Sequence, residues 1–132
     1  MNIILDSYAV LVFLQGEAGV ERVQEILDAA QTGETQAYLP LVNLGEIVYI
    51  IERKLGLEEA QSALSAIKQL PLTIFPVDEE NVLAAAHIKA QYPVSYADAF
   101  VVAAAQNLEA VILTGDPEFD VVKGFVEVEN LP

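Results

Sequence analysis

Four acidic residues stand where the sequence predicts that a strand gives way to a helix or a turn. Asp6 and Asp116 each follow a short apolar run, and Glu46 and Asp98 are each predicted to lie in the first turn of a helix. In a parallel sheet, the carboxyl ends of the strands and the amino ends of the following helices share one edge. The four carboxylates are therefore expected to converge at that edge.

Converging carboxylates favour a bound cation, because like charges held close together repel. The sequence has no cysteine and a single histidine, so the available ligands are oxygen atoms. Oxygen ligands favour Mg²⁺ or Mn²⁺ over Zn²⁺. Such an ion binds phosphate oxygens, lowers the pKa of a bound water and stabilises negative charge in the transition state. Two such ions can bind the attacking and the leaving oxygen at the same time. The predicted chemistry is therefore hydrolysis at a phosphate.

Each of these acids also has a purely local interpretation. The segments Asn43–Glu46 and Ser95–Asp98 both look like capping boxes, in which the acid reaches back to a backbone N–H. Asp116 precedes a proline and could be a turn residue, and Asp6 could simply end a strand. Local roles explain any one of these positions, but they explain less easily why four acids share one predicted edge.

Other polar residues lie close to this set in the sequence. Ser7 and Thr114 could hold an acid or a water by hydrogen bonds, with local capping as the alternative. Asp120, four residues after Asp116, could join the group. His87, the only histidine, falls in a different helix and is expected on a partly buried helix face instead of acting as a general base.

Composition limits the possible partners and locations. The 132 residues are enough for one domain, expected to span residues 1–132. No apolar run approaches the roughly 18–20 residues needed to cross a bilayer, and no secretion signal is evident, so a cytoplasmic protein without a membrane partner is expected. The net charge of −14 excludes long-range attraction to a phosphate backbone. Action on nucleic acid would need a bound cation or a local group of bases.

Apolar runs that alternate with helical patterns predict parallel βαβ units. The expected fold class is α/β, a three-layer α/β/α sandwich around a mostly parallel sheet of about five strands. Strands are predicted over Ile3–Leu5, Ala37–Leu39, Leu72–Val77, Ala110–Leu113 and Val126–Val128. Helices are predicted after a cap at Ser7, over Val20–Ala30, over Leu44–Lys54 with Asn43 as the cap, over Leu57–Ile67, from Asp78 to about Gln91, and after a cap at Ser95.

Two of these elements carry a further expectation. Pro76 lacks a backbone N–H, so the strand Leu72–Val77 is expected at an edge of the sheet or to end there. The helix Leu44–Lys54 is apolar nearly all round, so it is either buried or part of an interface. We expect it to contribute to a homodimer or to a groove for a partner protein.

The segments around the four acids resemble the PIN-domain family, especially VapC-like toxins of toxin–antitoxin pairs. The resemblance lies in ILDSYAVLVFL, LVNLGEIVYI, VSYADAFVVAAA and AVILTGDPEF, in that order and over nearly the whole chain. It implies a PIN-like fold and a Mg²⁺- or Mn²⁺-dependent endoribonuclease. The matching acids, as catalytic residues and metal ligands, are Asp6, Glu46, Asp98 and Asp116. It also implies an RNA substrate, a homodimer and a small antitoxin partner. Many members have Asn or Ser where this chain has Tyr8.

Two other acidic families match the sequence less well. A haloacid-dehalogenase-like phosphatase has a second aspartate two residues after the first, where this chain has Tyr8. A response-regulator receiver has an early acidic pair and a late lysine, but Asp6 stands alone and the segment 114–116 supplies no lysine. A catalytically weak or inactive PIN-fold module for metal binding or protein interaction remains open. Activity measured with and without the acids distinguishes it from a nuclease.

Overall fold

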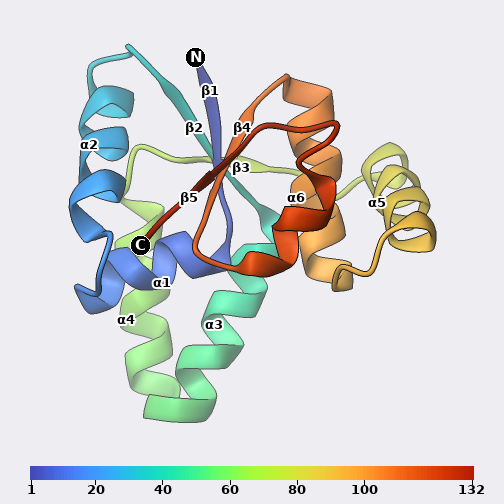
Figure 1. Cartoon of the computed structure of the whole chain (residues 1–132). Coiled ribbons are helices and arrows are strands. Elements are labelled where there is room, and N and C mark those ends of the chain that lie inside the picture. Colours follow the sequence, from blue (N-terminus) through green and yellow to red (C-terminus); the bar gives the residue numbers. More distant parts are fainter.

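A computed structural model describes all 132 residues and shows a five-stranded parallel sheet with helices on both faces (Figure 1). The strand order is β3-β2-β1-β4-β5. The three-layer α/β/α sandwich predicted from the sequence is therefore confirmed. In chain order the elements are β1 (Asn2–Leu5), α1 (Ser7–Gln15), α2 (Val20–Gln31), β2 (Gln36–Pro40), α3 (Leu41–Leu55), α4 (Leu57–Lys68), β3 (Thr73–Phe75), α5 (Glu79–Gln91), α6 (Tyr96–Leu108), β4 (Val111–Thr114), a 3₁₀ helix η1 (Pro117–Val122) and β5 (Val128–Asn130).

Residues 3–5 of the central strand β1 are buried on both faces of the sheet, which explains why this run is entirely apolar. Successive side chains of a strand point to opposite faces. Ile3 and Leu5 accordingly join a core formed with α1 to α4, whereas Ile4 joins a second core formed with α5, α6 and η1. Strand β1 pairs with β2 on one side and β4 on the other. The residue after β1, Asp6, therefore emerges at the middle of the sheet edge.

The helices begin differently from the predicted positions at two places. The cap of α1 is Asp6, whereas Ser7 is already the first helical residue. Helix α3 begins at Leu41, directly after Pro40. Proline has a fixed φ and no N–H to satisfy, so it can end β2 and start the helix at once. The predicted cap at Asn43 is wrong, because that residue lies inside α3 and is fully buried.

The strands agree with the predictions in number and order, with changes at their ends. Strand β3 is shorter than predicted and lies at one edge of the sheet, as expected from Pro76. Strand β5 begins at Val128, two residues later than predicted, because Val126 belongs to the turn closing onto Val122. The guanidinium of Arg22 in α2 donates two hydrogen bonds, of 2.6 and 3.0 Å, to Glu129 in β5. This pairing lowers the pKa of Glu129 and ties the last strand to the body of the fold.

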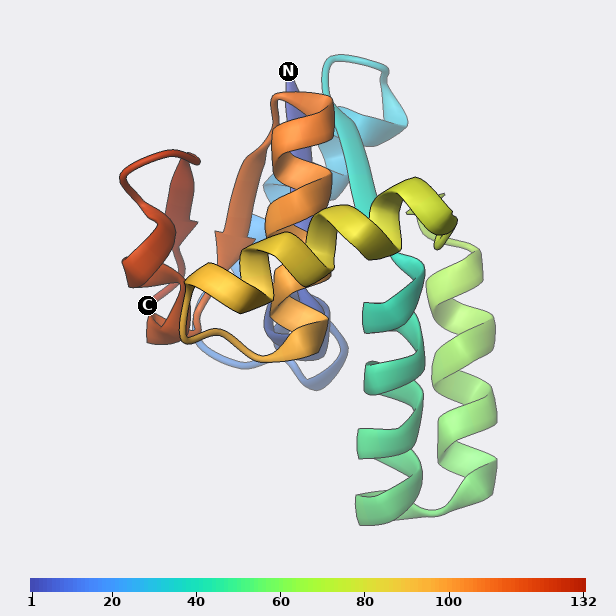
Figure 2. The same cartoon turned by 90° about the vertical axis from the view of Figure 1, so that its right-hand side faces the viewer.

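Helices α3 and α4 form a hairpin that extends beyond the sheet edge (Figure 2). Gly56, with φ of 96°, joins them. The apolar surface of α3 is divided: Ile47 and Ile51 are buried, whereas Leu41 and Tyr49 are about half exposed. The helix is therefore partly core and partly an accessible apolar surface. No helix of the chain has both the length and the apolar character needed to cross a membrane.

Candidate active site

A pocket at the carboxyl edge of the sheet contains all four acids predicted from the sequence. Its volume is about 340 Å³. It contains one acid that was not predicted, Glu118, and no lysine, arginine or histidine. The lining residues are Asp6, Ser7, Tyr8, Leu11, Glu46, Ile50, Ser95, Asp98, Asp116 and Glu118.

Asp6 is the most buried acid of the pocket, with 2% of its surface exposed. Its Oδ1 accepts a hydrogen bond of 2.8 Å from the backbone N–H of Ala9, which makes it the cap of α1. Its Oδ2 accepts a bond of 2.5 Å from the hydroxyl of Thr114. Burial raises the pKa of Asp6 to about 7, in spite of these two bonds, and the charges of Asp116 and Glu46 act in the same direction. Asp6 is thus both a helix cap and a poorly solvated carboxylate.

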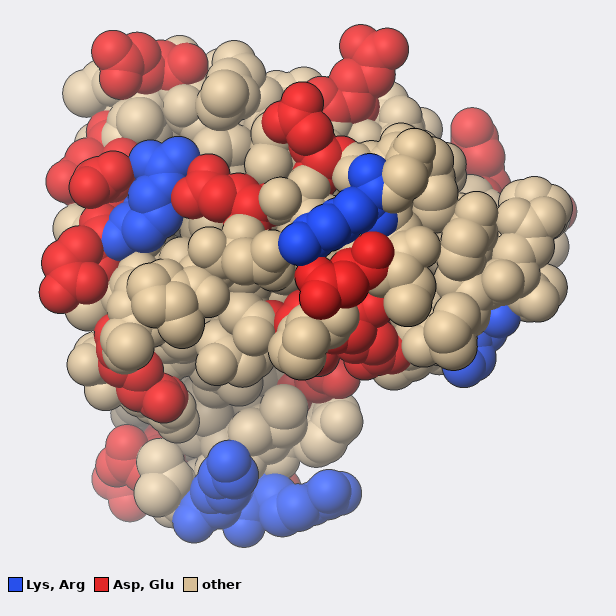
Figure 3. Space-filling view, in the orientation of Figure 1, with Lys and Arg blue, Asp and Glu red and all other residues tan.

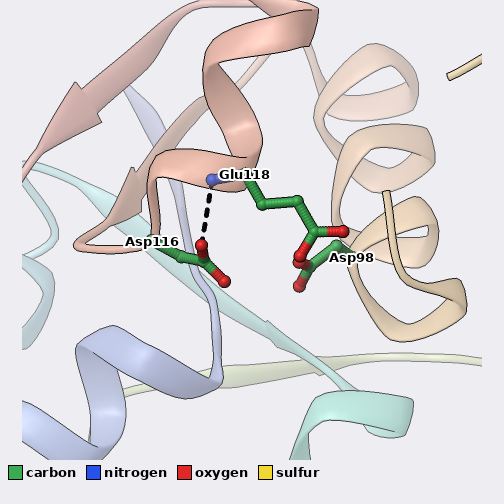
Figure 4. A group of neighbouring side chains, drawn as sticks. All are labelled: Asp98, Asp116 and Glu118. Carbon is green, nitrogen blue, oxygen red and sulfur yellow. Dashed lines mark hydrogen bonds between the residues drawn. The ribbon is translucent and has the colours of Figure 1, made fainter. Parts of the chain in front are cut away.

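Thr114, the last residue of β4, connects two of the acids. It is fully buried, donates to Asp6 and accepts a bond of 2.9 Å from the backbone N–H of Asp116. Asp116 in turn accepts a bond of 2.9 Å from the backbone N–H of Glu118, which is the dashed line in Figure 4. The expected local role of Asp116 is therefore real, because it caps η1. Its second carboxylate oxygen makes no hydrogen bond to the protein.

Asp98 is buried in the first turn of α6, as predicted, but only half of the expected capping box is present. Ser95 Oγ accepts a bond of 3.1 Å from the backbone N–H of Asp98. The reciprocal bond, from the backbone N–H of Ser95, goes to Glu118. The carboxylate of Asp98 is therefore available to the pocket.

Asp98, Asp116 and Glu118 lie close enough to share one cation. One carboxylate oxygen of each lies within 4.8 Å of the others, and the side chains converge from α6 and η1 (Figure 4). Burial raises the pKa of Asp98 above its ordinary value, and the hydrogen bond and charge of Glu118 and the charges of Asp6 and Asp116 add to this effect. Crowding of this kind is relieved when a cation binds.

Glu46 reaches the pocket from α3, supported by two buried polar residues. The hydroxyl of Ser7 donates a bond of 2.5 Å to Glu46 Oε1, and Asn43 Nδ2 donates one of 3.0 Å to the Ser7 hydroxyl. The capping box predicted for Asn43–Glu46 is therefore wrong. Since α3 starts at Leu41, Asn43 lies one turn before Glu46 on the same helix face and supports it through Ser7. Asn43 Oδ1 is buried without a hydrogen-bond partner.

Glu118 is the pocket acid that the sequence analysis does not predict, and Asp120, which could have joined the acids but is not among the expected ligands, lies elsewhere. Asp120 is absent from the pocket lining and forms an ion pair of 3.0 Å with Lys123. The signal for Glu118 was Pro117, which favours the first position of a helix. A helix starting there places residue 118 in the first turn, close to its cap Asp116.

The oxygen ligands that line this pocket fit a hard divalent cation. All the acidic ligands are carboxylates, and those of Asp98, Asp116 and Glu118 lie within reach of one ion. The pKa values of Asp6 and Asp98 are raised, and a bound ion would lower them. Mg²⁺ and Mn²⁺ prefer such oxygen ligands.

Comparisons with known proteins agree with this architecture. The chain resembles the VapBC2 structure from Rickettsia felis bound to a DNA fragment from its promoter, with a TM-score of 0.80, 14% identity and 100% of both chains covered. It also resembles VapC20 of Mycobacterium tuberculosis, a Sarcin-Ricin loop cleaving toxin, with a TM-score of 0.74, 18% identity and 98% and 99% coverage. FitAcB from Neisseria gonorrhoeae gives a TM-score of 0.70 at 21% identity, with 97% and 96% covered. No curated protein sequence matches. The PIN domain family model matches residues 3–124, so the chain belongs to the PIN domain family.

Proposed function

We propose that this protein is a Mg²⁺- or Mn²⁺-dependent endoribonuclease that hydrolyses RNA phosphodiester bonds. The observation that carries the proposal is the convergence of Asp6, Glu46, Asp98, Asp116 and Glu118 in one pocket without a cationic side chain. Membership of the PIN family supports the reaction class.

The five acids have different parts in this proposal. Asp98, Asp116 and Glu118 would hold the ion, because their oxygens lie within 4.8 Å of one another. When bound, the ion supplies an activated water and offsets the negative charge of the phosphate. Asp6 is held by Thr114 and by the backbone at the start of α1, and its negative charge at the base of the pocket attracts the cation. Glu46, held by Ser7, is placed to orient a water.

The charge of the whole protein makes the cation necessary for binding as well as for chemistry. Acidic side chains form clusters scattered over the face shown in Figure 3, between larger uncharged areas, and basic side chains form only a few separate groups there. The net charge is −14, so an RNA backbone is repelled at long range. We therefore expect EDTA to weaken RNA binding and not only to stop cleavage.

The experiment that tests the proposal is cleavage of a mixed RNA pool with Mg²⁺ or Mn²⁺, with EDTA as a control. Wild type is compared with Asp98→Asn, which keeps the shape of the side chain and removes its charge. Asp120→Asn is the matched control, because Asp120 is a nearby acid outside the pocket. We expect cleavage by wild type and Asp120→Asn, and none by Asp98→Asn or in EDTA. Absence of cleavage by folded, metal-loaded wild type would favour an inactive metal-binding or interaction module.

We further propose that the protein is the toxin of a toxin–antitoxin pair, forms a homodimer and acts on RNA in the cytoplasm. Several similar structures are toxin–antitoxin assemblies, including a toxin–antitoxin complex from Klebsiella pneumoniae. A groove on α3 and α4, lined by Leu41, Leu44, Val48, Tyr49 and Leu64 among others, offers apolar surface for a protein partner. If the proposal holds, the product of the adjacent reading frame will copurify with the chain and suppress RNA cleavage.

A further inference from the structure

Tyr8 is an exposed aromatic residue in the lining of the acidic pocket. It lies in the first turn of α1, two residues after Asp6, and 44% of its surface is accessible. Its hydroxyl has no hydrogen-bond partner within the protein, and the acids described above are held without it. The fold and the ligand set therefore do not explain why a large aromatic side chain stands here.

The ring of Tyr8 is fitted against Gly115. A Cβ added to Gly115 would overlap the ring and lie 2.7 Å from its Cδ1 and Cζ, so no side chain is tolerated at residue 115 while the ring stays in place. Gly115 does not have a positive φ, so the backbone conformation does not require glycine there. The glycine makes room for the ring, which rests on the loop carrying Asp116.

The pocket also has an apolar part beside its acids. Leu11, one turn after Tyr8 on α1, and Ile50, one turn after Glu46 on α3, both line it. A flat aromatic face next to aliphatic side chains suits a nucleobase, whereas the acids and their cation suit a phosphate. The two kinds of surface lie within one pocket of about 340 Å³.

The protein's charge limits what else could hold an RNA strand. The six lysines and arginines are all absent from the pocket lining, and the net charge is −14. Within the pocket, affinity for the strand must therefore come from the bound ion and from contacts that do not depend on positive side chains. Stacking on an aromatic face is such a contact, and it is available only to bases that are not already stacked in a duplex.

We propose, on the basis of the proposed ribonuclease function, that Tyr8 is a stacking platform for an unpaired nucleobase adjacent to the phosphate held in the acidic pocket. Tyr8 is a positioning residue, since it contacts the base and not the reacting atoms.

The absence of tryptophan from the chain allows a direct test of stacking. Tyr8→Trp creates a protein with one tryptophan, whose fluorescence is followed on rapid mixing with octaadenylate in Mg²⁺. The comparison ligand is an octamer of abasic ribose phosphates. Phe125→Trp is the matched control, because Phe125 is also an exposed aromatic residue but lies outside the pocket. We expect saturable quenching of Tyr8→Trp by octaadenylate, and no quenching with the abasic octamer or in Phe125→Trp.

The outcomes separate this inference from the proposed function. Cleavage of octaadenylate by Tyr8→Trp without quenching overturns the stacking role and leaves the nuclease intact. Quenching without cleavage of the mixed RNA pool by wild type supports stacking although the nuclease proposal fails. Absence of quenching and of cleavage of the mixed pool by wild type overturns both. Equal quenching by the abasic octamer also overturns stacking, because the signal would then report the phosphates.

Cleavage kinetics give a second readout. Tyr8→Leu keeps an apolar side chain but removes the π-face, and we expect KM for single-stranded RNA to rise about 5- to 150-fold with kcat little changed. Tyr8→Phe keeps the ring and should behave as wild type, and Phe125→Leu should do the same. An equal loss in Tyr8→Phe and Tyr8→Leu would assign the effect to the hydroxyl and overturn the proposal.

Discussion

The backbone N–H of Ser95 donates a hydrogen bond to the carboxylate of Glu118, 23 residues later in the chain. In a capping box this bond would be made by the acid three residues after the cap, here Asp98. Glu118 thus completes the cap of α6 from outside the helix, so the carboxylate of Asp98 is not used by the cap and lines the pocket. One hydrogen bond therefore stabilises the helix and makes a buried carboxylate available to the pocket.

Glu118→Gln and Glu118→Ala should separate these two roles. Gln retains an oxygen that accepts from Ser95, so we expect near-normal stability but a large loss of cleavage through the missing charge. Ala removes the cap as well, and we expect a further loss of about 1 kcal/mol in the free energy of unfolding. Urea denaturation and cleavage of the RNA pool measure the two effects. Equal stability of the two variants would contradict the capping role.

The stability of the metal-free protein should fall as the pH rises from 5 to 8. Burial raises the pKa of Asp6 from its ordinary value of 3.8 to about 7, and the pKa of Asp98 is also raised. In this window the folded chain keeps protons that the unfolded chain has released, so the free energy of unfolding decreases with pH. The lowered pKa of Glu129 acts below its ordinary value of 4.5, outside this window.

Asp98→Asn should make this pH dependence shallower and should stabilise the metal-free protein at pH 8. The substitution removes a buried charge. It keeps the backbone N–H of residue 98, which donates a hydrogen bond to the Ser95 hydroxyl. Urea midpoints in EDTA at pH 5 and pH 8 measure the change, with Asp120→Asn as the control. A variant less stable than wild type at pH 8 would show that the carboxylate of Asp98 supports the fold instead of opposing it.

Added Mg²⁺ or Mn²⁺ should reverse the instability at high pH. Ligand that binds only the folded state stabilises it by about 2.7 kcal/mol at a hundred times Kd. Because the ligands must be deprotonated, we expect a larger rise in Tm at pH 8 than at pH 5. The rise should disappear in Asp98→Asn and persist in Asp120→Asn. An equal rise in both variants would indicate that the ion binds outside the pocket.

Local sequence signals were enough to predict the sheet and the convergence of the acids. The apolar runs identified the five strands, and the rule that strand ends share one edge brought Asp6, Glu46, Asp98 and Asp116 together. What the local signals could not supply were the contacts between distant segments. The hydrogen bond from Thr114 to Asp6 joins residues 108 positions apart, and the bond from Ser95 to Glu118 crosses from one helix to another.

The two errors at helix starts have a common physical cause. Asn43 and Ser7 both have side chains typical of caps, and the sequence predicts a cap at each of them. In the structure Pro40 and Asp6 stand at the caps, and the displaced residues make a buried pair with each other. Ser7 lies one position and Asn43 three positions after the residue that caps its helix, and such short shifts are decided by tertiary packing.

That buried pair provides the last prediction, since Asn43 and Ser7 fix the carboxylate of Glu46. Ser7→Ala removes the hydrogen bond to Glu46 and leaves the amide of Asn43 without its acceptor. We expect destabilisation of about 1–3 kcal/mol together with a fall in kcat and little change in KM. Ser7→Thr, which keeps the hydroxyl, should restore most of the activity. If Ser7→Ala lowers stability but leaves kcat unchanged, the pair supports the fold alone and Glu46 is oriented by other contacts.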